Sequence, residues 1–377
     1  MRNKVLILSA SVGAGHLRAA DAVEKAMAAA HPEIETTNID VLEYTNPLFR
    51  RLYGKLYLDL VKRMPDALGW IYDSLDKPWQ KERRRLALDR LNTQPLIRLL
   101  IDEDPDIAIC THFLPAEIIS WLRAKKKITT RQAVVVTDFD AHALWLCRNY
   151  EHYFVPIEET AVYLEKVGIR KEDITVSGIP IDPVFAIVKN KFETREKLGL
   201  KTDLLTIMVS AGGFGVGNVE ILLKALAEMK TECQIVAICG RNEELRNEVS
   251  ALAKSLKTGA KARIVPVGFT DAMDEYMSAS DLIVGKPGGL TTSEALAKDL
   301  VFVIVNPIPG QEERNSDHLL EKGCAVKCNT LPTLAYKIDE LAASPARLTS
   351  MQANIKSLAR PNSASTVANK IIGLIDR

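Results

Sequence analysis

The feature that most constrains this chain is the alternation of short, β-branched apolar runs with helical patterns from one end to the other. The runs are apolar almost throughout, which is typical of strands buried on both faces. Strands of this kind, separated by helices, form parallel sheets covered on both sides, so an α/β fold is predicted. The runs are residues 5–10, 107–112, 133–138 and 174–180 in a first half, and 204–213, 234–240, 262–268, 282–289 and 301–307 in a second.

The length of 377 residues leaves room for about two domains. Two prolines in SGIPIDPVF (residues 177–185) and the charged stretch after them mark the boundary between the halves. We expect an N-terminal domain over residues 1–180 and a C-terminal domain over 181–360. A capped helix over 361–377 is expected to return to the N-terminal domain.

Charge and cysteine content limit the classes of partner and compartment. A net charge of +1 gives no general attraction to nucleic acid or membrane, so a charged partner must meet a local patch. The six cysteines form no CxxC pair and several lie in apolar runs, which fits a reducing cytoplasm. No apolar run reaches the roughly 18 residues that cross a bilayer. We expect a cytoplasmic protein, soluble or bound at a membrane surface, with no nucleic-acid partner.

Three glycine-rich turns follow predicted strands of the second half, at residues 210–218, 285–295 and 306–315. Glycine lets the backbone approach a phosphate, and the helix start that follows offers free N–H donors. A single turn of this kind is ordinary strand-to-helix geometry. Three at the carboxyl ends of strands in one half favour a phosphate-bearing ligand. The candidates are Gly212, Gly213, Phe214 and Gly215 in the first turn, and Gly288, Gly289 and Leu290 in the second.

The second turn, GGLTTSEA, is the most specific of the three. Thr291 and Thr292 open the helix and suit a diphosphate, which Lys286 could neutralise. Glu294 lies one turn inside the helix, where its carboxylate would accept hydrogen bonds from ribose hydroxyls. The alternative is a capping arrangement in which the threonines and the glutamate satisfy helix-end amides.

The third turn, PGQEERN, carries short-range donors and acceptors suited to sugar hydroxyls. These are Gln311, Glu312 and Asn315. The alternative is a polar helix start without a ligand.

His16 is the candidate base of the first half. SVGAGHLRAA joins a strand to a helix, and the turn with Gly13 and Gly15 places His16 at the helix entrance. There the helix dipole disfavours protonation, and the imidazole can take a proton from an acceptor hydroxyl. The alternative is a structural histidine.

The motif TDFDAH (residues 137–142) contributes a second group of polar residues. Asp138 and Asp140 resemble the metal-binding Asp-x-Asp pair found in glycosyltransferases, but they lie on the half without nucleotide signals, so no metal is expected. Asp138 would instead orient His16 or serve as an alternative base. His112 and His142, also at strand ends, line the acceptor region or fill it.

Taken together, these motifs resemble the monogalactosyldiacylglycerol synthases and processive diacylglycerol glucosyltransferases of glycosyltransferase family 28. The resemblance covers nearly the whole chain in motif order. It rests on SVGAGHLRAA, TDFDAHALW, SGIPIDPVF, GGFGVGN, CGRNEEL, VGFTDAMDEYMSASD, KPGGLTTSEAL and NPIPGQEERN. The first loop reads GAGH where many relatives have GGGH, which leaves the conformation of the acceptor loop less defined.

The resemblance implies a GT-B fold, with two Rossmann-like domains facing across a cleft. It implies inverting transfer, without a metal or other cofactor, from a UDP-hexose to diacylglycerol. His16 matches the family's proposed base, Glu294 its ribose-binding glutamate, and Gln311 with Glu312 its hexose-contacting pair. Phe269 falls where the family's backbone contacts uracil. Residues Gly212 to Gly215 fall where that backbone approaches the diphosphate. Arg241 and Asn242 of the CGRNEEL motif complete the expected donor site.

The segment of residues 47–90 breaks the strand–helix rhythm. It carries eleven Lys/Arg and six Asp/Glu, interleaved with aromatic residues. With a lipid acceptor, it is interpreted as a surface that docks on the inner face of an anionic cell membrane. The alternative is a pair of charged helices packed on its own domain. The docking residues are Phe49, Arg50, Arg51, Tyr53, Lys55, Tyr57, Lys62 and Arg63, and His142 joins them on the acceptor side.

Two other functions stay open from sequence. One is transfer of N-acetylglucosamine to a polyprenyl-linked peptidoglycan precursor, although the LTTSEAL and PGQEERN motifs favour the diacylglycerol branch. The other is a non-catalytic nucleotide-sugar sensor, against which the intact His16 and complete donor motifs argue. Glucose and galactose differ at one hydroxyl, so the sequence does not distinguish them, nor does it define the number of sugars added or the oligomeric state.

Overall fold

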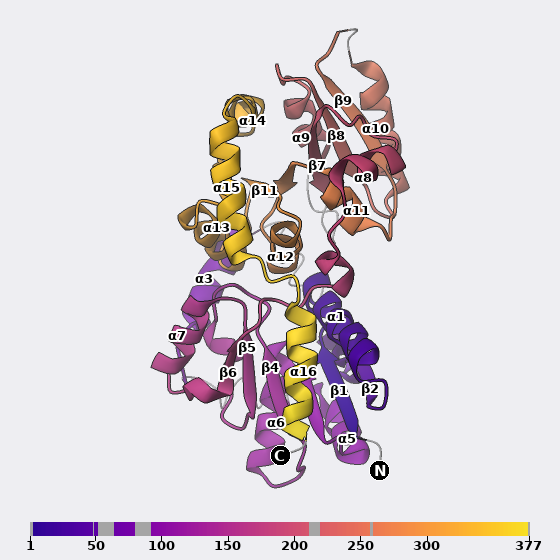
Figure 1. The fold of residues 1–377 in the computed structure, drawn as a ribbon. Coiled ribbons are helices and arrows are strands. Elements are labelled where there is room, and N and C mark those ends of the chain that lie inside the picture. The colour runs from indigo at the N-terminus through magenta and orange to yellow at the C-terminus, as the bar shows by residue number, and fades with distance from the viewer. Residues whose placement is uncertain are drawn as a thin grey trace. The chain divides into compact units, whose positions relative to one another are not determined.

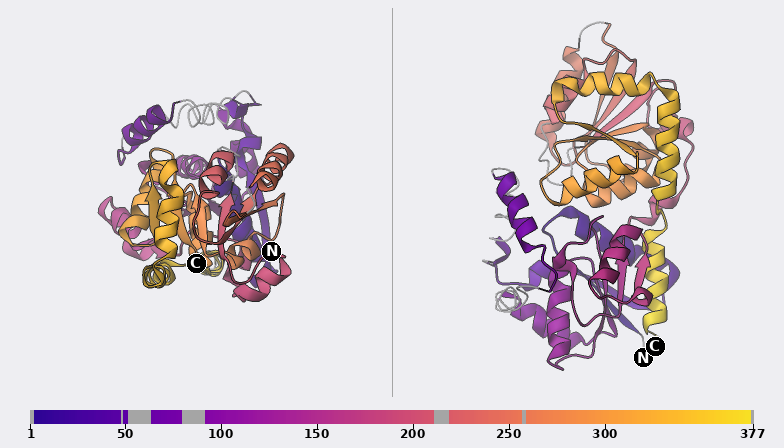
Figure 2. Two further views of the ribbon diagram at one scale, coloured as in Figure 1. Left: turned by 90° about the horizontal axis from the view of Figure 1, so that it is seen from above. Right: turned by 90° about the vertical axis from the view of Figure 1, so that its left-hand side faces the viewer.

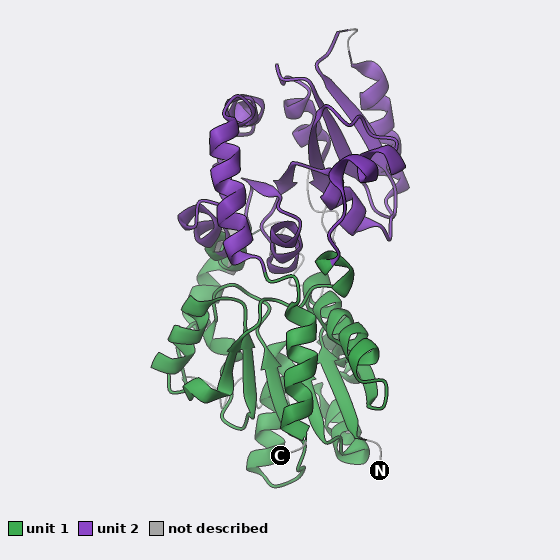
Figure 3. Cartoon of the chain, viewed as in Figure 1, with its two compact units in different colours: residues 1–186, 308–314, 360–377 green, residues 187–307, 315–359 purple. Residues whose placement is uncertain are grey.

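The computed structural model describes residues 3–47, 49–51, 64–79, 92–210, 219–256 and 259–375. The chain divides into two compact units (Figure 3). Unit 1 comprises Met1–Ala186, Ile308–Arg314 and Arg360–Arg377, and unit 2 comprises Ile187–Pro307 and Asn315–Ala359. Each unit is built on a six-stranded sheet. Every strand pair is parallel, so the predicted α/β class is confirmed.

The sheet of unit 1 has the strand order β2-β1-β3-β4-β5-β6. Its strands are β1 (Lys4–Ser9), β2 (Glu35–Asp40), β3 (Ile107–Cys110), β4 (Arg131–Val135), β5 (His152–Val155) and β6 (Ile174–Val176). Its helices are α1 (Ala14–Ala30), η1 (Val41–Tyr44), α3 (Pro65–Leu75), α5 (Gln94–Glu103), α6 (Phe113–Ala124), η2 (Ala143–Trp145), α7 (Glu158–Lys166), η3 (Lys171–Asp173), η4 (Pro183–Ala186) and α16 (Ser363–Ile375).

Alternation along β1 divides the core of unit 1 between the two faces of its sheet. Leu6 and Leu8 pack with residues of α5, α6 and α7. Val5 and Ile7 pack with residues of α1 and α16. Successive strand side chains point to opposite faces, so both faces must be covered by helices.

The C-terminal helix α16 supplies half of the cover on one face of this sheet. Val367 and Ile371 join the same core cluster as Val23 and Met27 of α1. The two helices lie side by side in Figures 1 and 2. The core of unit 1 therefore depends on residues that are more than 300 positions apart in the sequence.

The sheet of unit 2 has the order β12-β11-β10-β7-β8-β9. Its strands are β7 (Leu205–Ser210), β8 (Cys233–Ile238), β9 (Ala262–Val267), β10 (Leu282–Gly285), β11 (Val301–Val305) and β12 (Ala325–Cys328). Its helices are α8 (Lys191–Lys197), α9 (Val219–Leu226), α10 (Glu243–Ser255), α11 (Met273–Ala279), α12 (Gly289–Ala297), η5 (Leu331–Thr333), α14 (Leu334–Ala342) and α15 (Pro345–Leu358), together with α13 (Gln311–Glu321), whose first four residues are counted with unit 1.

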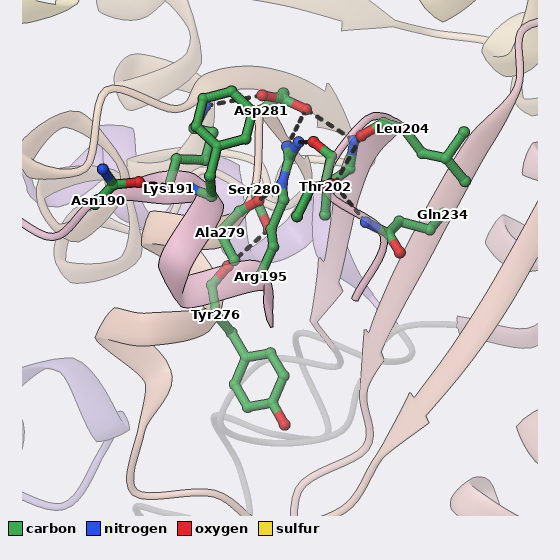
Figure 4. Close-up of polar contacts among 12 residues, drawn as sticks. Asn190, Lys191, Arg195, Thr202, Leu204, Gln234, Tyr276, Ala279, Ser280 and Asp281 are labelled. Carbon is green, nitrogen blue, oxygen red and sulfur yellow. Dashed lines mark hydrogen bonds and ion pairs between the residues drawn. The ribbon is translucent and has the colours of Figure 1, made fainter. Parts of the chain in front are cut away.

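A buried arginine fastens α8 to the amino ends of the strands of unit 2 (Figure 4). Arg195 is 4% exposed, and its Nη2 donates to Asp281 Oδ2 at 2.7 Å. Its Nε donates to the carbonyl of Ala279 at 2.8 Å, and its Nη1 to the carbonyl of Thr202 at 2.8 Å. Asp281 also accepts from the backbone N–H of Thr206, near the start of β7. Because this network lies at the amino ends, it leaves the carboxyl edge of the sheet to ligands.

No helix in the described ranges has both the length and the apolar character needed to cross a membrane.

Replacing Arg195 with Ala should lower the free energy of unfolding by about 3 kcal/mol, because two carbonyls and a partly buried carboxylate each lose the donor that Arg195 supplies. Urea denaturation followed by circular dichroism measures the change. The exposed pair Lys261–Glu232 provides the control, and Lys261→Ala should cost less than about 1 kcal/mol. Equal losses in the two variants would show that the Arg195 network does not anchor α8.

Candidate functional site

The carboxyl ends of β1, β3 and β4 in unit 1 bring three sequence-distant segments together. The loop after β1 leads into α1 and carries His16, while Thr111 and Thr137 follow β3 and β4 closely. Parallel neighbouring strands end at one edge, so these side chains meet there. The N-cap of α1 is Gly13, an extended residue with no side-chain cap, and no acidic residue lies in the first turn.

The imidazole of His16 is held by its Nδ1 atom. Nδ1 lies 3.1 Å from the carbonyl oxygen of Thr111 and 2.8 Å from Oγ1 of Thr137. A carbonyl oxygen can only accept, so these partners assign the proton to Nδ1. The lone pair of Nε2 is then available to a substrate, as a general base requires.

Burial sets the charge of this histidine. Desolvation lowers the pKa of His16 to about 4, against the opposing effect of the Thr111 carbonyl. The ring of His112 packs edge-on against it, with ring centroids 4.8 Å apart. Nδ1 of His112 accepts from the N–H of Leu114 and caps α6, and burial holds the pKa of His112 well below its usual value. Two neutral imidazoles therefore lie side by side at neutral pH.

Asp138 lies in the same region but does not orient His16. Its side chain is 7% exposed and accepts a hydrogen bond from Nε1 of Trp145 at 3.0 Å and another from the amide of Gln311. Among the described residues it has no hydrogen bond with His16, so the expected orienting role belongs instead to Thr111 and Thr137. Burial raises the pKa of Asp138 to about 7, partly offset by the bond from Trp145.

Asp140 and His142 are engaged within unit 1. Asp140 pairs with Arg314 at 2.9 Å. Nδ1 of His142 accepts from the N–H of Leu144, and its Nε2 lies 2.9 Å from the carbonyl oxygen of Tyr72. Neither ring nitrogen of His142 is left for an acceptor. Within the described ranges, no three His, Cys, Asp or Glu side chains are grouped as a metal site would need.

The start of α12 in unit 2 has no side-chain cap. Its N-cap is Gly288, and no acidic residue lies in its first turn. Gly288 has no side chain and so cannot itself cap the helix. Thr292 is fully buried, and its Oγ1 has no hydrogen-bond partner among the described residues.

Burial separates the polar residues of this turn into two groups. Glu294 is 1% exposed, and Gly289 and Leu290 at the start of the same helix are also buried. Lys286, Thr291 and Ser293 are half-buried, and the hydroxyl of Ser293 donates to the carbonyl of Gly289.

The other expected donor residues divide between exposed and structural positions. The guanidinium of Arg241 lies 4.7 Å from the ring centroid of Phe269, which is 55% exposed. Asn242 caps α10 by accepting from the N–H of Leu245. Asn315 is fully buried and donates to the carbonyl of Pro287, so it supports the turn after β10.

Gln311 and Glu312 lie in the part of α13 that is counted with unit 1. The Gln311 amide contacts Asp138, a link between the third glycine turn and the TDFDAH motif that sequence reasoning missed. Oε2 of Glu312 accepts from the N–H of Ile308 and closes the turn before the helix.

Of the remaining expected residues, Gly13, Gly15 and Phe49 are half-buried, and Arg50 and Arg51 are exposed. Several lie outside the described residues: Gly212, Gly213, Phe214 and Gly215 of the first donor turn, and Tyr53, Lys55, Tyr57, Lys62 and Arg63 of the docking segment. Thr111, Thr137 and Trp145 were not singled out from the sequence. Their positions just after strand ends, or within the TDFDAHALW motif, are the signal that would have identified them.

Both halves of the chain are similar to known glycosyltransferase sequences. Residues 16–181 match the monogalactosyldiacylglycerol (MGDG) synthase family, and residues 190–358 match the glycosyl transferases group 1 family. A processive diacylglycerol beta-glucosyltransferase of Bacillus pumilus is 29% identical over 371 residues, which cover 98% of this chain and 94% of that protein. The protein of the same name from Staphylococcus carnosus is 29% identical over 99% of this chain and 93% of its own length.

A solved structure extends the likeness to the fold. MurG of Acinetobacter baumannii superposes with a TM-score of 0.62 at 16% sequence identity, over 99% of this chain and 100% of that chain. The predicted GT-B fold is therefore confirmed. The two family matches follow one another along nearly the entire sequence, and over that length the chain is similar to processive diacylglycerol beta-glucosyltransferases.

Proposed function

We propose that this enzyme transfers a hexose, glucose or galactose, from a UDP-sugar to diacylglycerol with inversion at the anomeric carbon. The similarity to diacylglycerol glucosyltransferases over nearly the full chain supports the donor and the acceptor class. The observation that carries the chemistry is the neutral His16, whose Nδ1 is held by Thr111 and Thr137 and whose Nε2 is left for a substrate.

The reaction is a single displacement. Nε2 of His16 takes the proton of the acceptor hydroxyl as its oxygen bonds to the anomeric carbon, and the bond from that carbon to UDP breaks. The hydrogen bond from Nδ1 to the Thr111 carbonyl strengthens as the imidazole becomes positive. Charge gathers on the departing diphosphate, which the uncapped start of α12 stabilises.

The donor is assigned to the carboxyl edge of the sheet of unit 2. Lys286 and Thr291 meet the diphosphate, because both are half-buried polar side chains near the start of α12, whereas the hydroxyl of Ser293 donates to the Gly289 carbonyl. Glu294 accepts from the ribose hydroxyls. The backbone at Phe269 meets uracil, and the stacked Arg241 holds that ring in place.

The proposal includes no metal ion. The two carboxylates that resemble a metal pair have other partners: Asp138 accepts from Trp145 and Gln311, and Asp140 pairs with Arg314. The positive charge that pairs with Asp140 is therefore the guanidinium of Arg314.

The acceptor places the enzyme at a membrane. We propose that it binds peripherally at the inner face of the cell membrane, where the exposed Arg50 and Arg51 meet anionic headgroups. Lys and Arg near such a surface contribute about 1 kcal/mol each, an attraction that salt screens.

The function is tested by incubating the purified protein with radiolabelled UDP-glucose, UDP-galactose or UDP-N-acetylglucosamine and diacylglycerol in vesicles. We expect a labelled glycolipid from one of the two hexose donors and the same rate with a chelator present. Label only from UDP-N-acetylglucosamine, or UDP binding without any transfer, would contradict the proposal.

His16→Ala should lower turnover by about 10²–10⁴, the range typical of a lost general base, with UDP affinity nearly unchanged. The pH dependence distinguishes the two candidate bases. A base must be unprotonated, so with His16 the rate falls only as pH drops through about 4. If Asp138 were the base, the loss would occur near pH 7. Initial rates on a detergent-solubilised acceptor, with Asp138→Asn as the comparison, decide between them.

Glu294→Gln should weaken UDP binding by about 1.5–3 kcal/mol, the scale of a hydrogen bond to a charged group. Isothermal calorimetry with UDP measures the change, and circular dichroism checks that the variant is folded. Glu232→Gln is the matched control on an exposed carboxylate, and it should bind UDP as the wild type does. Equal affinity in both variants would leave Glu294 as a packing residue.

A further inference from the structure

Helix α3 of unit 1 turns large apolar side chains outward. Trp70 is 73% exposed, Ile71 36% and Leu75 38%, and Met64 just before the helix is 57% exposed. The other three tryptophans of the chain are half-buried or buried. Residues 64, 71 and 75 are seven and four apart, so they form one stripe of the helix, with Trp70 beside it. A helix that packs on a core has the opposite arrangement.

The other side of α3 is polar and closely held. Arg314 pairs with Asp73 at 3.2 Å and with Asp76 at 2.9 Å, and its guanidinium lies 5.1 Å from the ring centroid of Tyr72. The second oxygen of Asp76 accepts from the N–H of Ala143 at 2.9 Å. The backbone of Gly310 lies so close to Tyr72 that a Cβ there would be 3.2 Å from the ring.

These contacts fix which side of α3 faces solvent. Turning the helix to bury Trp70 would separate Arg314 from two carboxylates and leave the N–H of Ala143 without its acceptor. It would also break the bond between His142 and the carbonyl of Tyr72. The apolar side therefore stays outward unless something outside the chain covers it.

Charge and side-chain type indicate what that covering is. The segment of residues 47–90 has eleven Lys/Arg and six Asp/Glu, and two of those six, Asp73 and Asp76, are already paired with Arg314. What remains is strongly basic. Tryptophan, with a large apolar ring and one N–H donor, is the side chain enriched at membrane interfaces. An apolar helix side that belongs to a segment with this excess of Lys and Arg in its sequence is complementary to an anionic bilayer.

We propose that the outer side of α3, formed by Met64, Trp70, Ile71 and Leu75, inserts into the interface of the bilayer that carries the acceptor. The inner side of the same helix is tied to the segment that follows Asp138: Arg314, which pairs with Asp73, also pairs with Asp140, and the C-cap Asp76 accepts from the N–H of Ala143. The docked helix thus carries the candidate acceptor site to the membrane. The choice of a lipid surface rests on the proposed function, whereas the outward apolar side does not.

The test compares wild type with Trp70→Ser/Ile71→Ser on vesicles of phosphatidylcholine and phosphatidylglycerol. Each large apolar side chain removed from the interface should lower the partition coefficient about tenfold. Phe192→Ser is the matched control, because Phe192 is 61% exposed on unit 2, and its binding should equal that of wild type. Equal vesicle binding by the double variant and wild type would overturn the proposal.

A second measurement locates the contact. Vesicles with brominated acyl chains should quench the tryptophan fluorescence of wild type, while Trp70→Phe should still bind but lose the quenching. If Trp70→Phe is quenched as strongly as wild type, another tryptophan lies in the bilayer and the proposal fails.

Turnover separates this inference from the proposed function. On a short-chain diacylglycerol dissolved as monomers, the double variant should transfer sugar at the wild-type rate, and it should be slower only on vesicle-borne acceptor.

If wild type transfers sugar to no diacylglycerol but still binds vesicles through Trp70, the proposed function fails and the docking surface stands. If the double variant binds vesicles normally but no longer self-associates in sedimentation, the outer side of α3 is covered by a second copy of the chain and not by lipid.

Discussion

Both six-stranded sheets are fully parallel, and a parallel sheet must be covered by helices on both faces because its strands are apolar on both sides. In unit 1 this requirement is met only when the last helix of the chain, α16, packs with α1 over Val5 and Ile7. In unit 2 the amino ends of the strands are fastened by Arg195 and Asp281. Neither arrangement involves the carboxyl ends of the strands, and the candidate catalytic and donor residues lie at those ends.

Burial at the edge of unit 1 shifts two ionisable groups in ways that suit different roles. Removing water disfavours the charged form of each group, so the pKa of His16 falls to about 4 while that of Asp138 rises to about 7. His16 is then neutral at physiological pH, with its proton directed to Nδ1 by the Thr111 carbonyl. Asp138, bound by Trp145 and Gln311, stabilises the surrounding loop rather than the imidazole.

Arg314 connects three separate parts of unit 1. It pairs with Asp73 of α3, with Asp76 at the C-cap of that helix, and with Asp140 of the loop after β4. One guanidinium presents five donors in a rigid planar fork and can therefore satisfy several carboxylates in a fixed geometry. The orientation of α3, and with it the outward side that carries Trp70, therefore depends on a residue in the third glycine turn.

The sequence by itself determined the α/β class, because apolar runs such as residues 133–138 and 301–307 alternate with helical patterns, as strands buried on both faces of a parallel sheet do. It also placed His16 and the GGLTTSEA turn at strand-to-helix junctions, since glycine and helix-start residues are local signals.

The sequence patterns did not reveal the strands β2, β5 and β12. The polar ETTNID of β2 is an edge strand, and HYFV of β5 and AVKC of β12 are short strands in which His152 and Lys327 break the apolar pattern. Only the tertiary structure decided what surrounds each site residue. The bond from Gln311 to Asp138 joins positions 173 residues apart, and the partners of His16 come from the ends of two other strands. Hydrogen bonds and desolvation depend on distance in space, and the pattern of residues along the chain does not encode which loops of a sheet come into contact.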